Sequence, residues 1–388
     1  MALLVPMLWS VCPIEESDEV KSFFRSWRES LQFLGESALP NRIAFYSEGE
    51  YCAPFLRPVI DALADIYDGT VYYLTSDAYD SFLLNTPKHV QAYYIGSGGA
   101  RTYVLNHMQA DVVALTTPDL NTIHIKRSPK VKHYAYLHHS MVSTHMIYRK
   151  GAFDHFDSIF CVGPHHCTET REWEDSQDLP AKLLFEHGYA PLDSLIDAAQ
   201  NAAAPPVRGE NRLNVLLAPS WGPHGLLETS AEKIVQILLE ADHYVRVRPH
   251  PRTRQLSGAV LDQLTVKFRD HPRFDFDEDT TKYEALFNSD VMISDWSGVA
   301  MEFAFGLERP VLFIDVPRKT NNPDYQVLSA VPLEVSYREA VGQIISPDRL
   351  EDIPAALALF QQNSDSFRAN VRELRARCFY NIGSSASQ

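Results

Sequence analysis

Residues 291–315 constrain the fold of this chain more than any other stretch of its sequence. They read VMISDWSGVAMEFAFGLERPVLFID, in which two apolar runs flank a polar turn and an amphipathic segment. This order predicts a strand, a helix over 299–306 and a second strand over 311–315. Two strands joined through a helix are typical of a parallel sheet covered by helices. The polar turn then lies at the N-terminus of the helix.

The turn between the first strand and the helix is a candidate anion site. Backbone N–H groups at a helix N-terminus are unpaired and lie at the positive end of the helix dipole, so they attract phosphate groups. Hydroxyl groups and a glycine in the turn add donors and allow close approach to the backbone. A polar side chain of the turn can instead simply cap the helix. The candidate phosphate-binding residues of the turn are Ser294, Asp295, Ser297 and Gly298.

Two further strand patterns upstream end in polar residues. One ends just before Ser220, and the other ends at Arg248, two residues before His250. Ligands collect beyond the carboxyl ends of the strands in an open parallel sheet, so we expect these side chains to lie beside the turn at 294–298. A cation, an imidazole and a helix N-terminus favour a phosphate-bearing ligand. The alternative is a structural ion pair at Arg248 and an ordinary strand-end histidine.

The N-terminal half carries histidines at the end of its own strand pattern. The apolar run at 134–137 is followed by His138, His139 and Ser140. Imidazole titrates near neutral pH, so a histidine in a cleft can take the proton of an attacking hydroxyl or donate one to a leaving oxygen. Side chains alternate along a strand, so at most one of the two histidines faces the cleft. Both can also be ordinary polar residues at a strand end.

Strand-like and helix-like segments alternate through most of the chain, which predicts an α/β protein. A stretch poor in large apolar residues, 201–211, interrupts this alternation and is the predicted linker. We therefore predict an N-terminal Rossmann-like domain over 1–200 and a C-terminal Rossmann-like domain over 212–350. A cleft lies between them, and a helical tail over 351–388 follows.

Hydrophobic periodicity predicts the individual elements. In the first domain we expect strands at 42–47, 70–75, 91–95, 111–115, 133–137 and 157–162, and helices at 53–66 and 99–109. In the second we expect further strands at 243–248, 264–269 and 291–294, and helices at 229–240 and 281–288. The apolar segment Met1–Pro13 is too short to span a bilayer and is expected to form the first strand.

The length and net charge of the chain limit the functions that it can have. A chain of 388 residues exceeds a typical single core, which fits two domains. The net charge of −15 argues against broad binding to nucleic acid. One basic run, at 124–133, is either a contact for an anionic membrane surface or polyanionic acceptor, or a solvated loop.

Cysteine usage favours a reducing cytoplasm. The five cysteines are odd in number and scattered along the chain, unlike a disulfide framework. Cys161, His165, His166 and Cys167 invite a metal interpretation. Their order does not match the paired cysteines and paired histidines of a structural zinc site, so we predict no metal site.

Five segments taken together resemble the CDP-glycerol glycerophosphotransferase family, which comprises teichoic-acid and capsule polymerases and primases. The resemblance covers roughly residues 130 to 320, in the family's order, and implies a GT-B-like fold. It also implies transfer of glycerol phosphate from CDP-glycerol to a hydroxyl of a glycerol-phosphate or saccharide acceptor, with release of CMP. The segments are YLHHS at 136–140, GYAPLD at 188–193, LAPSW at 217–221, RPH at 248–250 and SDWSG at 294–298.

The resemblance also implies roles for the candidate residues. His139 maps to the catalytic base, and His250 maps to the second catalytic histidine, which with Arg248 stabilises charge on the pyrophosphate. The loop at 294–298 holds phosphate oxygens, and Ser220 lies on the donor side. No metal or cofactor is implied besides CDP-glycerol as co-substrate. The acceptor is a glycan or polyol phosphate that can be lipid-linked, which would bring peripheral contact with the inner face of the membrane.

Two departures from the family pattern keep other functions open. Ser140 stands where the family has glycine, and the loop after Trp221 has Gly222-Pro223-His224 where an arginine often follows. A nucleotide-sugar glycosyltransferase would use the same domains and attack an anomeric carbon instead of phosphorus. A non-catalytic nucleotide-binding protein on the same scaffold is the third reading.

Overall fold

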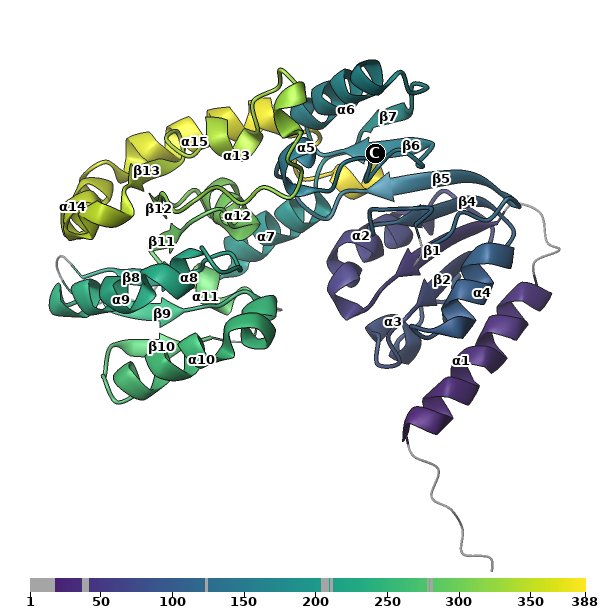
Figure 1. The fold of residues 1–388 in the computed structure, drawn as a ribbon, viewed down its shortest axis with the longest axis horizontal. Helices are drawn as coiled ribbons and strands as arrows, with labels where there is room; N and C mark the ends of the chain where they lie inside the picture. Colours follow the sequence, from purple (N-terminus) through teal and green to yellow (C-terminus); the bar gives the residue numbers. More distant parts are fainter. Residues whose placement is uncertain are drawn as a thin grey trace, which may run out of the picture.

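The computed structural model describes residues 18–36, 42–122, 125–203, 209, 212–277, 279 and 282–388. Two parallel sheets, each flanked by helices, form two domains that stand next to one another (Figure 1). The strand expected at Met1–Pro13 and most of the expected linker lie outside the described residues.

The N-terminal domain is built on a seven-stranded sheet in the order β3-β2-β1-β4-β5-β6-β7, with every neighbouring pair parallel. Its strands are β1 (Ile43–Ser47), β2 (Val71–Thr75), β3 (Val90–Tyr94), β4 (Ala110–Leu115), β5 (Val131–Leu137), β6 (Ser158–Cys161) and β7 (Leu183–Glu186). Its helices are α1 (Asp18–Gly35), α2 (Ala53–Leu63), α3 (Ser81–Leu84), α4 (Gly99–His107), α5 (Thr144–Ile147), α6 (Pro164–Gln177) and α7 (Ala190–Asn201), with a 3-10 turn η1 at Glu50–Cys52.

The central strands are apolar along their whole length because both faces of the sheet are covered. Successive residues of one strand enter different cores: Tyr46 and Leu74 pack in one cluster, whereas Phe45 and Tyr73 pack in another. A strand buried on both faces reads as a continuous apolar run instead of an alternating one. The VYYLT run of β2 is of this kind.

The C-terminal domain repeats this plan with six parallel strands in the order β10-β9-β8-β11-β12-β13. The strands are β8 (Asn214–Leu217), β9 (Tyr244–Val247), β10 (Phe274–Phe276), β11 (Val291–Ser294), β12 (Val311–Ile314) and β13 (Gly342–Ile345). The helices are α8 (Leu226–Thr229), α9 (Ala231–Glu240), α10 (Pro251–Phe268), α11 (Glu284–Phe287), α12 (Gly298–Leu307), α13 (Leu333–Ser336), α14 (Ile353–Gln362) and α15 (Ser364–Cys378), with 3-10 turns η2 (Tyr325–Val327), η3 (Pro347–Asp352) and η4 (Ser385–Ser387).

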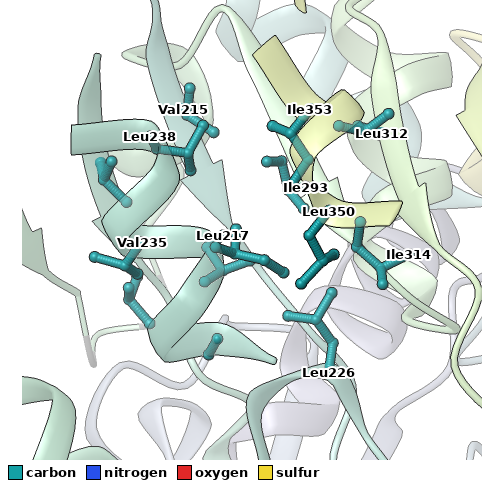
Figure 2. Packing of buried hydrophobic residues seen from close by; sticks show 14 of the residues in the cluster. Val215, Leu217, Leu226, Val235, Leu238, Ile293, Leu312, Ile314, Leu350 and Ile353 are labelled. Atoms are coloured by element: carbon teal, nitrogen blue, oxygen red, sulfur yellow. The ribbon is translucent and has the colours of Figure 1, made fainter. Parts of the chain in front are cut away.

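One face of this second sheet carries its own aliphatic core. Val215, Leu217 and Ile293 from the strands meet Val235 and Leu238 of α9 in a fully buried cluster (Figure 2). Burying each such side chain contributes about 1.5–3 kcal/mol relative to leaving it in water. The core holds the strands in register and thereby fixes the loops at their carboxyl ends.

A separate core joins the two domains. Helix α7 of the first domain packs against α12 of the second, and α15 packs on α12 as well. The two helices approach closely at Gly306, where an added Cβ would lie 2.5 Å from Cδ2 of Leu195. The domains are therefore held by interlocked helices in addition to the chain that connects them.

The C-terminal tail returns to the first domain. After α15, which lies along the top of the view in Figure 1, the Tyr380 N–H donates to the Val162 carbonyl at 2.9 Å. The buried Asp193 carboxylate accepts the N–H groups of Gly383 and Ser385 at 2.7 and 2.8 Å. The tail thus ties α15 to the start of α7.

The predicted fold class is confirmed: two Rossmann-like α/β domains are followed by a helical C-terminal region. One predicted strand, 264–269, is wrong, because residues 264–268 form the end of α10. Leu261, Leu264 and Phe268 are buried at helical spacing, while Val266 between them is exposed. The strand of this region is the short β10, whose FDF pattern is too brief for a periodicity argument.

Candidate active site

The polar turn after β11 is fastened to the loop after β8, the neighbouring strand at which the strand order reverses. The buried Asp295 carboxylate accepts the Ser220 N–H at 2.7 Å and the Leu226 N–H at 3.0 Å. The Ser294 hydroxyl donates to the Ala218 carbonyl at 2.7 Å. Asp295 and Ser294 therefore shape the site by joining two loops at the position where doubly wound sheets bind ligands.

The N-terminus of α12 is left open by this arrangement. Ser297 is the N-cap residue, yet its side chain forms no capping hydrogen bond in the structure. Gly298 follows as the first helical residue, and an added Cβ there would lie 3.6 Å from the Ser140 hydroxyl. The structure thus brings the end of β5 in one domain against the α12 N-terminus in the other. Ser297, Gly298 and Ser140, which the sequence singled out separately, meet at the domain junction.

Arg248 lies at the end of β9 but is already engaged. Its Nη1 donates to the Lys282 carbonyl at 2.9 Å and lies 3.5 Å from the Asp277 carboxylate. Burial lowers the pKa of Arg248, and Asp277 and Glu302 oppose that shift. A phosphate bound here would compete with existing partners.

His250 caps α10 with its ring. Nδ1 accepts the Arg252 backbone N–H at 3.1 Å, which leaves Nε2–H of the neutral ring as a donor. Burial, together with the cations Lys319 and Arg252, lowers the pKa of His250 to about 4. At neutral pH this histidine is therefore a hydrogen-bond donor without charge.

Two cations that the sequence analysis missed lie on the indole ring of Trp221. The Lys319 Nζ is 3.3 Å from the ring centroid, and the Arg252 Cζ is 4.2 Å from it. The His250 ring lies 6.1 Å from the same indole, centroid to centroid. Lys319 comes from the segment after β12 and Arg252 from the first turn of α10. Only the general rule that loops at strand ends converge could have drawn attention to them.

On the other side of the junction, His139 is held in one tautomer. Its Nδ1–H donates to the Thr116 carbonyl at 2.8 Å and lies 3.0 Å from the Tyr136 hydroxyl. Nε2 therefore keeps its lone pair, and the Tyr148 hydroxyl lies 3.2 Å from it. Burial lowers the pKa of His139, so its ring is neutral at physiological pH. A neutral imidazole whose Nε2 is unprotonated is the form that can accept a proton.

Tyr189 and Glu302 connect this histidine to the second domain, and neither was picked out from the sequence. The Tyr189 hydroxyl lies 3.0 Å from the Glu302 carboxylate on α12 and 3.4 Å from the His139 carbonyl. Burial raises the pKa of Glu302, while the hydroxyl of Tyr189 and the charge of Arg248 oppose that shift. The pair links the His139 backbone to the helix whose N-terminus faces Ser140.

His138 points away from this group. It is buried, and its ring stacks on that of His166 at 3.8 Å between centroids. Neither ring nitrogen has a hydrogen-bond partner in the described part of the chain. Burial and the neighbouring histidines hold the pKa of His138 well below its usual value. The alternation of side chains thus places one histidine in the core and the other at the junction.

Other segments considered from the sequence have structural partners. In the basic run, Arg127 forms a bidentate ion pair with Asp157 at 2.8 Å, and Lys132 pairs with Asp111. His165 and His166 bind the carbonyls of Met141 and Val142. Within the described residues, none of the helices is both long and apolar enough to cross a bilayer.

The fold and this group of residues define a class. Two Rossmann-like domains present a neutral histidine on one side of their junction, and a helix N-terminus with basic side chains on the other. This is the GT-B arrangement of enzymes that act on nucleotide-activated substrates.

The model of one family, CDP-glycerol:poly(glycerophosphate) glycerophosphotransferase, matches residues 87–320, and the chain belongs to that family. Among solved structures, it is similar to the wall teichoic acid polymerase TagF soaked with CDPG, at 12% identity and a TM-score of 0.55, over 95% of this chain and 92% of that one. It is also similar to the UDP-GlcNAc 2-epimerase of Methanocaldococcus jannaschii, at 16% identity and a TM-score of 0.53, over 89% and 97%. A search of curated protein sequences found no match.

Proposed function

We propose that this protein transfers glycerol phosphate from CDP-glycerol to a hydroxyl of a glycerol-phosphate or saccharide acceptor, releasing CMP, in the synthesis of a cell-surface polymer. The observation that carries the proposal is the environment of His139. Its Nδ1–H is fixed on the Thr116 carbonyl, so Nε2 is the nitrogen that can accept a proton, and the next residue, Ser140, lies against the α12 N-terminus of the second domain. Membership in the family supplies the donor and acceptor classes.

In the proposed reaction, His139 Nε2 removes the proton of the acceptor hydroxyl as that oxygen attacks the β-phosphorus of CDP-glycerol. A bond forms between the acceptor oxygen and the β-phosphorus. The bond from that phosphorus to the bridging oxygen breaks, and the bridging oxygen leaves as part of CMP. Tyr148, at 3.2 Å from Nε2, would give way to the incoming hydroxyl. A positioned base of this kind is worth about 10²–10⁴-fold in rate.

In this proposal the second domain supplies the groups that stabilise the negative charge on the phosphates. The N–H groups at the start of α12 and the Ser297 hydroxyl can donate to phosphate oxygens. His250 can donate Nε2–H as a neutral group, because its Nδ1 is occupied by the helix. Preorganised donors of this type stabilise the transition state without rearrangement.

A second candidate is a nucleotide-sugar glycosyltransferase. Two observations favour considering it: the loop after Trp221 lacks the arginine often found in the family, and proteins of similar fold include an epimerase in complex with UDP-GlcNAc and UDP. This reaction would break a sugar–oxygen bond and release a nucleoside diphosphate.

A donor panel separates the two functions. Purified protein is incubated with CDP-glycerol, CDP-ribitol or UDP-GlcNAc and with glycerol-phosphate or saccharide acceptors, and the released nucleotide is identified by chromatography. We expect CMP from CDP-glycerol. Release of UDP from UDP-GlcNAc, with CDP-glycerol left intact, would contradict the proposal and support the glycosyltransferase.

A further inference from the structure

We propose that Lys319 and Arg252, gathered on Trp221, form a cation pair that binds the second phosphate of a nucleoside diphosphate and so distinguishes the intact donor from the nucleoside monophosphate product. This inference rests on the proposed function for the identity of the donor. It concerns residues from three separate segments that meet beside His250.

In the residues that the structure describes, no carboxylate forms an ion pair with Lys319 or Arg252. Asp295 is the acid that acts on Lys319, yet both of its carboxylate oxygens are occupied by backbone N–H groups. Half-buried Lys319 is thus held against an aromatic face with a second cation close enough to repel it.

Holding two like charges together is unfavourable unless an anion joins them. The indole offsets part of the repulsion, since the face of a tryptophan ring attracts a cation. Burial, and after it Arg252, lowers the pKa of Lys319 to about 8, although Asp295 opposes the shift. A bound phosphate would supply the missing negative charge.

The position of the pair fits a diphosphate. Trp221 follows Ser220, whose N–H is fixed by Asp295 directly before the α12 turn, so the cations lie by the same loops as the helix N-terminus. The loop after Trp221 contributes no cation of its own through 222–224. Lys319 and Arg252 therefore bring positive charge to this loop from other elements. A monophosphate can satisfy the helix N-terminus alone, whereas a diphosphate can use both groups.

The test is the affinity for nucleoside diphosphates relative to monophosphates. Calorimetry compares CDP with CMP and UDP with UMP, for the wild type, Lys319→Met, Arg252→Met and the control Lys233→Met, which alters an exposed lysine on α9. We expect the wild type and the control to bind the nucleoside diphosphate at least tenfold more tightly than the corresponding monophosphate. Each of the other two variants should lose most of that ratio and keep its monophosphate affinity within about twofold.

The outcomes separate this inference from the donor assignment. If Lys319→Met and Arg252→Met lose the preference for UDP over UMP, and no cytidine nucleotide binds to the wild type, the cation pair is supported. The assignment of CDP-glycerol as the donor is then overturned. An unchanged ratio in Lys319→Met and Arg252→Met would overturn the cation pair and leave the two cations a structural contact of Trp221. A wild type that does not prefer diphosphates in either series would also overturn it.

A second readout does not depend on ligand. Because Lys319 lowers the pKa of His250, the Lys319→Met variant should titrate its His250 ring at higher pH in NMR spectra, whereas Lys233→Met should not. A His250 titration that is the same in Lys319→Met and wild type would show that Lys319 is not close enough to act on the site.

Discussion

At the scale of single residues, the protein separates two adjacent histidines by environment. His138 is stacked in the core on His166, and His139 keeps Nε2 unprotonated at the domain junction, where the Tyr148 hydroxyl lies 3.2 Å from it. The strand pattern was sufficient to predict that only one of them faces the junction. It could not show that Thr116, from a different strand, fixes the tautomer of His139.

The candidate residues that the sequence patterns did not reveal were all missed for the same reason. Glu302, Arg252 and Lys319 are distant from one another along the chain and lie outside the five segments, and the segment at 188–193 that contains Tyr189 does not show what its hydroxyl meets. They matter through neighbours in space: a carboxylate across the junction or an indole that two cations contact. By contrast, His250 and Ser297 follow strand and helix patterns directly, so their positions could be predicted.

The shifted pKa values predict the pH profile of activity. Burial lowers the pKa of His139 below 6.5, and the base must be neutral, so kcat/KM should fall only when the pH drops below that value. The pKa of Lys319, near 8, should give a loss of donor binding above pH 8 as its charge disappears. We expect Lys319→Arg to move this alkaline limb upward, because arginine stays charged.

Rates measured from pH 5 to 10 with subsaturating donor test both limbs. The groups that face Lys319 are Asp295, Arg252 and His250, and of these His250 is neutral throughout the alkaline range. An acid limb centred above pH 6.5, or an alkaline limb that Lys319→Arg leaves in place, would contradict the assignment.

At the scale of elements, the contact of α7 with α12 positions the two halves of the site. Helix α7 begins beside Tyr189, and α12 begins at the turn proposed to bind phosphate. The pattern of the sequence predicted α12 and the strands on either side of it, because apolar runs and a polar turn define them locally. It misplaced the strand at 264–269, since a short apolar segment reads the same in a buried helix as in a strand.

Two helix glycines make a matched test of this contact. Gly306→Ala would place a methyl group 2.5 Å from Leu195, and overpacking of this kind costs about 1–3 kcal/mol. Gly258→Ala in α10, directly after the non-helical Ser257, meets only Arg254 Cδ at 3.9 Å, so it should be close to neutral. Urea unfolding, followed by circular dichroism, measures the change in the free energy of unfolding for each variant. Equal effects of the two substitutions would show that α7 and α12 are not tightly packed at Gly306.

At the scale of the whole molecule, the candidate site lies where the domains meet. The proposed base comes from the first sheet, the phosphate-binding groups come from the second, and the C-terminal tail returns across both. The two-domain architecture could be predicted because each half repeats the alternation of strands and helices. How the halves face each other depends on side-chain packing between α7, α12 and α15, which no local pattern encodes.

The most direct test is to identify the nucleotide released from CDP-glycerol by wild type, His139→Ala and the control His107→Ala, which alters an exposed histidine on α4. Attack on phosphorus with His139 as base predicts CMP as the product. The rate should fall on the order of a hundredfold or more in His139→Ala and stay unchanged in His107→Ala. Release of CDP, or CMP release at the wild-type rate in His139→Ala, would contradict the account.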